Sequence, residues 1–472
     1  MATKPKIQTL NATSADIVNV VTRSMPNEYQ GMVPLALSPG SIDAYGNVVT
    51  QAQSVESLRQ IGSVIMNYQP IQNAFLTTLV NRIGKVVLQS KLYDNPWAMF
   101  KRGLLEYGET IEEIFVNIAK PFQYDPVTAE TEVFKREIPD VLAAFHTMNY
   151  QKFYKSTVSN DQLRQAFLSW EGVSNLITKI IESLYTAANY DEFITMKYLI
   201  ARVALAGGIA PITIPAVSAE NARSIVTDIK SVSNKWEFMS SAYNIAGVKN
   251  YANKNDQFLI MTSDFNATMD VEVLSLAFNM EKSEFLGHSV LVDSFAPNTD
   301  EIERLNVLFA EDNTYIPFTP DEITKLASIP AILVDRDWFM IFDNFYNMTD
   351  IYNGQGLYFN YFYHVWKTFS VSPYANSSMF TTLTNAVTAV AVTPETATVA
   401  KGSSIQLSSE ITGTGFVNKN VLWSIDSELS SISVTGLLSV SATETAATIT
   451  VTATSIEDPE VTGTATITVS AG

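Results

Sequence analysis

The C-terminal part of the chain, from about residue 388 to residue 472, differs in composition from everything before it. Beyond Thr388 the aromatic residues are reduced to Phe416 and Trp423, and the only basic residues are Lys401 and Lys419. Thr, Ser, Val and Ala alternate instead, as in ATITVTATS and TGTATITVS. An alternation with period two predicts half-buried strands whose Thr and Ser side chains face water. We therefore expect 388–472 to form a separate all-β module.

The spacing of turns within this module predicts a β-sandwich. Short alternating stretches are separated by turn signals at Lys401-Gly402, Gly413-Thr414-Gly415 and Gly436, which suggests about seven strands with Trp423 filling the core. The alternating apolar positions are Ile405, Leu407 and Ile411; Val421, Trp423 and Ile425; Ile449, Val451 and Ala453; and Ala465, Ile467 and Val469.

The preceding region, 1–376, is expected to be a larger α+β body, joined to the module by a linker over 377–387. Its strongest signal is a helix over about 172–206, whose apolar stripe includes Ile177, Ile181 and Leu184 and which Gly207-Gly208 ends. A helix of some thirty residues is about 45 Å long, which exceeds the usual globular length and suggests a structural spine.

The rest of the body mixes short helices and strands. Residues 1–70 are predicted to be a polar, helix-poor N-terminal arm, and about 90–140 an extended arm or hairpin. Ser218 is expected to cap a second helix, and Thr319-Pro-Asp-Glu322 is a capping box that begins another. Two strands are expected in 331–344 and 356–371. This order is mixed rather than a repeating βαβ pattern, so it favours an α+β fold.

Composition excludes several classes of function. The chain has no cysteine, which removes disulfides, thiolate metal sites and thiol nucleophiles. A formal net charge of −18 argues against nucleic-acid binding, which needs clustered Lys and Arg, although Lys101-Arg102 and Lys135-Arg136 form isolated pairs. No secretory leader is recognised, and Lys197 and Arg202 interrupt the most apolar stretch, so we expect an intracellular product that does not enter membranes.

We find no catalytic, cofactor-binding or metal-binding motif. His146, His288 and His364 are scattered, and a role as core or surface residues is favoured for each. Asp335-Arg336-Asp337 resembles a metal-binding pair of carboxylates, but its aromatic neighbours suit a strand junction better. Three acidic residues could share a solvated helix face, namely Glu109, Glu112 and Glu113.

The densest aromatic run in the chain, Tyr358 to Phe369 with Trp366, has only Lys367 as a basic neighbour. Stacking on nucleobases would require more positive charge. A packed core or a subunit contact is the favoured interpretation, because aromatic residues dominate buried interfaces.

Two resemblances follow from these residues. The module resembles the group 2 bacterial immunoglobulin-like domain, through Val390-Ala-Val-Thr-Pro394, Val421-Leu-Trp-Ser424 and Val434-Thr-Gly-Leu-Leu438. The body resembles the major capsid proteins of phi-29-like short-tailed phages, the Picovirinae. The similar stretches, in the family's order, are FLTTLVNRIGKVV, TIEEIFVNIAK with QYD, FHTMNYQKFY, QAFLSWEG, VEVLSLAFNM with FLG, RDWFMIFDN and GLYFNYFYHVWKTFSVSPYAN.

The second resemblance implies a Hong Kong 97-type capsid fold with an N-arm, an extended arm, a spine helix, and peripheral and axial domains. The stretch from about 297 to 328 looks longer than the family pattern and is expected to form an extra surface or axial excursion.

In function, the resemblance implies a non-enzymatic subunit that assembles as pentamers and hexamers into an icosahedral or prolate head around double-stranded DNA. A scaffolding protein and a portal are the implied assembly partners, and the virion, assembled in the host cytoplasm, is the implied location. The module is expected at the outer surface, where contact with a host surface or with neighbouring subunits are the open alternatives. The rival interpretation is a bacterial surface adhesin that carries an immunoglobulin-like module.

Overall fold

The computed structural model describes residues 14–43, 46–68, 70–75, 78, 93–105, 110–119, 121, 141–159, 172–272 and 288–470. The chain divides into two compact units. The first consists of Met1–Asn95, Tyr150–Glu192 and Phe345–Trp366, and the second of Pro96–Asn149, Phe193–Asn344 and Lys367–Gly472. Within the described ranges, no helix has the length and apolar character needed to cross a bilayer.

The N-terminal part of the first unit is helical, so the expectation of a helix-poor lead over 1–70 is wrong. It contains α1 (Ser14–Thr22), α2 (Asn27–Gln30) and α3 (Gln51–Asn67). Thr50 and Gln53 form a reciprocal capping box at the start of α3, which satisfies free backbone N–H groups there. Leu58, Ile61 and Ile65 recur at helical spacing and are buried, so packing outweighs the polar composition.

The core of the first unit gathers these helices with strands from later in the chain. β4 (Tyr150–Ser159) supplies Val158, and the longest helix, α7 (Gly172–Leu205), supplies Ile181 and Leu184. The aromatic run contributes Phe359 and Tyr361, both buried, from the part of β10 (Tyr358–Val371) that lies in this unit. The long helix expected over about 172–206 thus corresponds to a single helix, α7.

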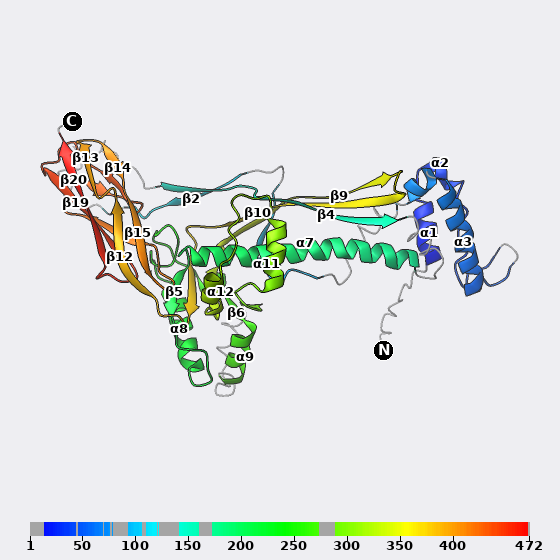
Figure 1. The fold of residues 1–472 in the computed structure, drawn as a ribbon, viewed down its shortest axis with the longest axis horizontal. Helices are drawn as coiled ribbons and strands as arrows, with labels where there is room; N and C mark the ends of the chain where they lie inside the picture. Colours follow the sequence, from blue (N-terminus) through cyan, green and yellow to red (C-terminus); the bar gives the residue numbers. More distant parts are fainter. Residues whose placement is uncertain are drawn as a thin grey trace, which may run out of the picture. The chain divides into compact units, whose positions relative to one another are not determined.

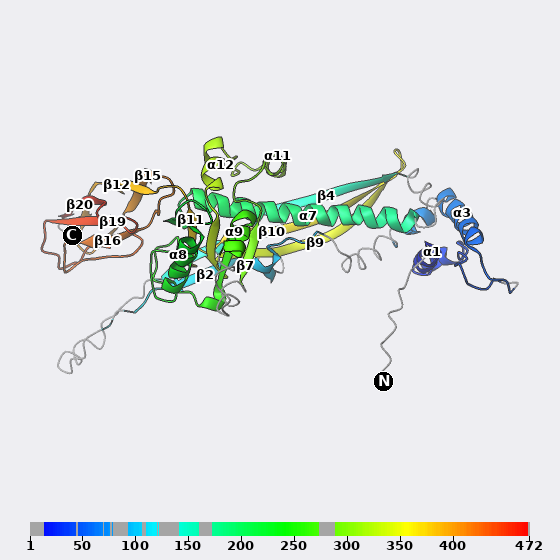
Figure 2. The ribbon, with the colours of Figure 1, turned by 90° about the horizontal axis from the view of Figure 1, so that it is seen from below.

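A five-stranded sheet organises the second unit, with strand order β5-β11-β8-β6-β7. Its strands are β5 (Ala210–Thr213), β6 (Gln257–Thr262), β7 (Ser289–Val292), β8 (Ala331–Asp335) and β11 (Ser377–Thr381). β8 is antiparallel to both of its neighbours, β6 and β11, whereas the outer strands β5 and β7 pair in parallel. The helices α8 (Ala222–Lys235) and α9 (Ser263–Glu272) lie side by side in Figures 1 and 2 and bury Ile225, Ile229 and Phe265 in one core with this sheet.

Two boundaries in this unit differ from the sequence expectation. The predicted linker over 377–387 is wrong, because β11 occupies Ser377–Thr381, is fully buried, and pairs on both sides. Because this stretch is rich in Ser and Thr, its composition did not indicate an interior strand of the sheet. Ser218 is also not the cap of α8: the helix starts at Ala222 after Asn221, and the Ser218 hydroxyl instead accepts a hydrogen bond from the Asn221 N–H.

The stretch expected as an extra excursion, about 297–328, contains two short helices, α11 (Thr299–Leu308) and α12 (Pro320–Ala327). Asn298 with Glu301, and Thr319 with Glu322, form a capping box at each N-terminus, which confirms the box predicted at Thr319. The turn at 336–338 divides the predicted strand over 331–344 into β8 and the start of β9 (Phe339–Asn353). Short 3-10 helices occupy Ala98–Phe100 and Lys254–Asp256, and β1 (Lys101–Leu104) pairs in parallel with β9.

The arm expected over about 90–140 is described in part. β2 (Ile111–Val116) and β3 (Val141–His146) pair as an antiparallel ribbon, with Ile111 opposite His146 and Val116 opposite Val141. Residues 122–140, which include the Lys135-Arg136 pair, lie outside the described residues.

The C-terminal module is a β-sandwich whose first strand begins at Ala386. Its strands are β12 (Ala386–Thr393), β13 (Thr396–Ala400), β14 (Ser404–Gln406), β15 (Ser408–Thr414), β16 (Val421–Ile425), β17 (Ser431–Ile432), β18 (Leu437–Ser439), β19 (Thr448–Ser455) and β20 (Thr462–Ser470), and all but β17 and β18 are labelled in Figures 1 and 2. Aliphatic residues such as Leu407, Leu438 and Ile449 fill its core. Trp423 is only partly buried and packs against this core, so the prediction that it fills the centre is wrong.

Glu444 ties the turn before β19 to the loop after β16. Its carboxylate accepts hydrogen bonds from the hydroxyls of Ser427 and Ser430, each at 2.6 Å, and from the N–H groups of Thr445 and Ala446. These donors, the Ser427 and Ser430 hydroxyls foremost, stabilise the charged form and lower the pKa of Glu444 to about 2.

This geometry predicts an acid-sensitive sandwich. A carboxyl whose pKa is lower in the folded than in the unfolded state stabilises the fold above its unfolded pKa, near 4.5, and that stabilisation is lost as pH falls towards 2. In thermal unfolding measured at several pH values, Glu444→Gln is expected to destabilise the sandwich at neutral pH. The variant should also lose less stability than the parent chain as pH falls from about 4.5 to about 2. Glu410→Gln, at an exposed position of β15, is the control and should follow the parent chain.

Candidate functional site

The ribbon of β2 and β3 presents an exposed apolar face. Because directly paired residues share a face, the pairs Ile114–Ala143 and Val116–Val141 point the same way, together with Phe145 opposite Glu112. Ile114 is 59% exposed, Val116 56%, Val141 50% and Phe145 64%. We call this set, Ile114, Val116, Val141, Ala143 and Phe145, the outer arm face. An exposed, contiguous apolar face of this kind marks a protein interaction surface.

The opposite face of the ribbon is held by its own subunit. The Phe115 ring stacks on Tyr374, with ring centroids 5.3 Å apart and planes 23° from parallel. The Ser372 hydroxyl donates to Glu113 Oε1 at 2.7 Å, and His146, which is buried, contacts Glu113 Oε2 at 3.2 Å and the Ser370 hydroxyl at 2.7 Å. The ribbon is therefore attached to its own subunit through this face, whereas the described part of the chain does not cover the outer arm face.

This contact corrects the interpretation of the acidic cluster. Glu112 and Glu113 lie on a strand rather than a helix, so their side chains point to opposite faces. Glu112 is exposed, as expected, but Glu113 is bonded to a histidine and a serine; Glu109 lies outside the described residues. Sequence reasoning missed this group because its partners His146 and Ser372 lie 33 and 259 positions away along the chain.

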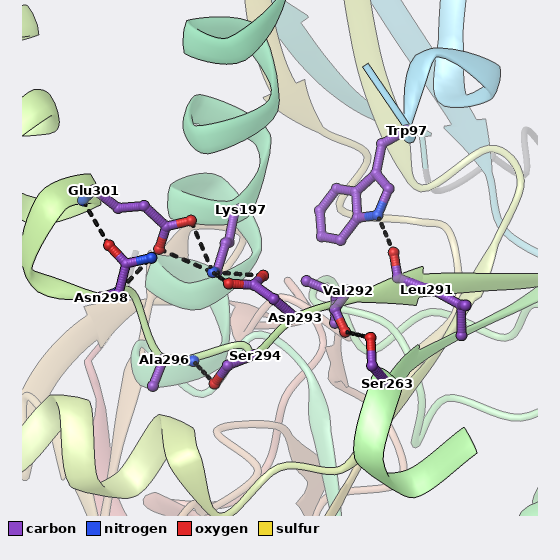
Figure 3. Close-up of polar contacts among 10 residues, drawn as sticks. All are labelled: Trp97, Lys197, Ser263, Leu291, Val292, Asp293, Ser294, Ala296, Asn298 and Glu301. Carbon is purple, nitrogen blue, oxygen red and sulfur yellow. Dashed lines mark hydrogen bonds and ion pairs between the residues drawn. The ribbon is translucent and has the colours of Figure 1, made fainter. Parts of the chain in front are cut away.

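A buried lysine holds the extra helices in the second unit. Lys197 of α7 points between two carboxylates in Figure 3: its Nζ lies 2.9 Å from Asp293 Oδ1 and 2.9 Å from Glu301 Oε2. Glu301 also accepts the Asn298 N–H at 2.9 Å, so one carboxylate both caps α11 and pairs with Lys197. In the sequence, the only sign of this cluster was a lysine that interrupts an apolar helical stretch.

Arg202, one turn further along α7, holds the segment before α12. Its guanidinium donates to Glu322 Oε1 at 2.9 Å and to the Ile316 and Pro317 carbonyls, each at 2.8 Å, and it stacks over the Phe318 ring. Lys197 and Arg202 thus hold the two inserted helices against α7 in the second unit.

The Asp335-Arg336-Asp337 motif is a strand junction, as its aromatic neighbours suggested. Asp335 is buried and accepts the Asp337 N–H at 3.0 Å, whereas Asp337 is exposed and pairs with Arg102 at 2.7 Å. Within the described ranges, no group of three or more His, Asp or Glu side chains is arranged to hold a metal ion. His288 and His364 lie beside aromatic rings, those of Phe258 and Phe153 respectively.

The burial of Asp335 predicts a pH effect opposite to that of Glu444. Desolvation raises the pKa of Asp335 to about 6, so its contribution to stability is lost as pH rises from about 4 through about 6. Asp335→Asn keeps the acceptor for the Asp337 N–H and is expected to stabilise the chain by about 1–3 kcal/mol at pH 7.5. Chemical denaturation at pH 4 and 7.5 checks this, with the exposed Asp321→Asn as control; an equal effect at both pH values would contradict it.

The aromatic run has a mixed environment. Within the first unit, Phe359 and Tyr361 are core residues, whereas Trp366 is 36% exposed and lies against Phe345, with ring centroids 4.7 Å apart. The prediction of a packed core is confirmed for Phe359 and Tyr361.

Comparison with known proteins agrees with this architecture. The Phi29-like phage major capsid protein family matches residues 18–381, and the group 2 bacterial Ig-like domain matches residues 386–469. The major capsid protein of Bacillus phage B103 is 34% identical over 440 residues, covering 92% of this chain and 88% of that protein. That of Streptococcus phage Cp-1 is 28% identical over 334 residues, covering 67% and 86%.

Among solved structures, the capsid of Staphylococcus phage Andhra aligns with a TM-score of 0.48 at 15% identity, covering 63% of this chain and 86% of that chain. The family match over the body, with the spine helix, the arm ribbon and the α+β sheet, confirms the expected Hong Kong 97-type capsid fold followed by an all-β immunoglobulin-like sandwich. A surface adhesin is not favoured, since the match lies in the body rather than the module alone. The chain is therefore a shell-forming structural protein that belongs to the Phi29-like phage major capsid protein family and carries a group 2 bacterial Ig-like domain.

Proposed function

We propose that many copies of this chain close into the head shell through their arms, each outer arm face lying on a neighbouring subunit. The observation that carries this proposal is the apolar outer arm face, which no described residue of its own subunit covers. Burying an aliphatic or aromatic side chain of this size contributes about 1.5–3 kcal/mol, and an arm that reaches over a neighbour enlarges the interface. Repeated contacts of one kind generate a closed surface.

The shell would be icosahedral or prolate, built of pentamers and hexamers around double-stranded DNA, with a scaffolding protein and a portal as partners in the host cytoplasm. The net charge of −18 suits the inner surface of such a shell, because a negatively charged protein does not bind the DNA phosphates tightly. The role is association rather than catalysis. We place the division between the shell part and the Ig-like domain between Thr381, the end of β11, and Ala386, the start of β12.

Microscopy of the purified chain tests assembly. The full chain, expressed alone and together with a candidate scaffolding protein, is expected to give closed shells in negative stain and a fast-sedimenting species. Only small, monodisperse particles under both conditions would contradict the proposal.

The Ig-like domain is proposed to lie at the outer surface of the shell, with two alternative roles. The domain either contacts a host surface, where the weak contacts of many copies act together, or binds neighbouring subunits to one another. Removing residues 386–472 separates them. Heads of normal stability would exclude the bonding role, and unchanged adsorption to host cells would exclude the contact role.

A further inference from the structure

The Ig-like domain is bound to the body of its own subunit by a loop that fits closely against it. This loop, residues 415–420, lies between β15 and β16. The Asn418 side-chain amide donates to the Ala242 carbonyl at 3.0 Å, and the Asn420 amide donates to the Asn244 carbonyl. Asn418 and Asn244 are both buried. We call residues 242–248 together with Gly207 the socket.

Gly207, just beyond α7, completes the socket. Its φ of +77° suits glycine, and a Cβ atom there would lie 2.6 Å from Lys419 Cγ and 2.8 Å from the Val417 carbonyl oxygen. Asn385 adds a further link between domain and body: its side chain accepts the Phe416 N–H at 2.7 Å and donates to the Thr213 hydroxyl at 3.2 Å. These close polar contacts hold the Ig-like domain against the body of its subunit, so the domain is not attached by a flexible linker alone.

The socket is in turn bonded to the segment 372–377. The Ala246 N–H donates to the Pro373 carbonyl at 2.9 Å, and the Ser377 N–H donates to the Tyr243 carbonyl at 2.6 Å. Asn250, two residues beyond the socket, donates from its side chain to the Tyr374 carbonyl at 2.8 Å. These bonds set the position of the segment from the side of the socket.

The same segment carries the root of the arm. Tyr374 stacks on Phe115, and the Ser372 hydroxyl donates to Glu113. The Ig-like loop, the socket, the segment 372–377 and the arm ribbon therefore form an unbroken series of hydrogen bonds and one ring contact. Energetic coupling between two sites can be carried by a contiguous network of packed and hydrogen-bonded groups of this kind.

We propose that the Ig-like domain acts in cis as a brace for the arm: its docking in the socket holds the segment 372–377 and so restrains the ribbon that β2 and β3 form. The brace belongs to a single subunit, so it is measured before assembly and does not depend on whether shells form. The domain has this role in addition to any contact at the outer surface.

Hydrogen exchange of the full, unassembled chain tests the brace. Asn420→Ala and Gly207→Leu are each expected to speed exchange of the amides in Ile111–Val116 and Val141–His146 by on the order of tenfold, since local opening becomes easier. Amides of β19 and β20 should stay protected, which shows that the sandwich itself remains folded. Ser424→Ala, at an exposed position of β16, is the matched control and should change nothing.

A double-mutant cycle decides whether the effect travels through Tyr374. Phe115→Ala removes the ring contact, so adding Asn420→Ala to it should give little further increase in exchange of the arm. Fully additive effects would overturn the proposed route. Faster exchange in 242–248 with unchanged exchange in the arm ribbon would overturn the brace. For Gly207→Leu, unchanged exchange in both 242–248 and the arm ribbon would also overturn it.

Discussion

Replacing Lys197 with Met is expected to lower the free energy of unfolding by about 3–5 kcal/mol, because it leaves buried carboxylate charge without its partner. The Lys197 side chain is 2% exposed and that of Glu301 is 4% exposed, whereas Asp293 is 54% exposed and keeps its water. Most of the loss therefore arises at Glu301, which also caps α11. Chemical denaturation of the unassembled chain measures the change.

Two further variants show whether charge is the cause. Lys249→Met, at an exposed position, should change stability by less than about 0.5 kcal/mol. Adding Glu301→Gln to Lys197→Met should recover part of the loss, because glutamine keeps an oxygen for the Asn298 N–H and removes the unpaired charge. A double variant less stable than Lys197→Met alone would show that the cluster acts through shape rather than charge.

The elements that sequence patterns predicted well are those whose signal is local. The stripe that includes Ile177, Ile181 and Leu184 specifies α7, and Thr319 with Glu322 specifies the start of α12, since all these residues act within a few positions of one another. The alternation in ATITVTATS likewise corresponds to β19, with Ile449, Val451 and Ala453 buried.

The errors fall where a tertiary partner decides the structure. Ser377–Thr381 has the composition of a linker, and only its two neighbours β5 and β8 make it a buried strand. Trp423 was assigned to the core because of its size, but it lies at the margin, where Gly436 leaves room for the ring. Neither of these two features can be predicted from a short stretch of adjacent residues.

The polar groups of the site were hidden for the same reason. Lys197 and Glu301 are 104 positions apart, and Glu113 and Ser372 are 259 positions apart, so no motif spacing connects them. The arm was foreseen only as an extended segment. Its outer face could be read only after the register of β2 and β3 showed which side chains share a side.

The second large effect concerns assembly: Ile114→Asp or Phe145→Asp is expected to prevent shell formation at the concentration at which the parent chain assembles, while the subunit stays folded. Ile114 and Phe145 are 59% and 64% exposed, so a charge there costs the subunit little, and its own unfolding should shift by less than about 0.5 kcal/mol. Against a neighbour, the loss of apolar burial and the desolvation of a carboxylate amount to about 3 kcal/mol per contact, which raises the concentration needed for assembly on the order of 100-fold. Sedimentation and microscopy over a concentration series measure this, with Ser424→Asp, which adds the same charge on β16, as control. Shells that form at the parent concentration from both arm variants would show that the outer arm face is not buried between subunits.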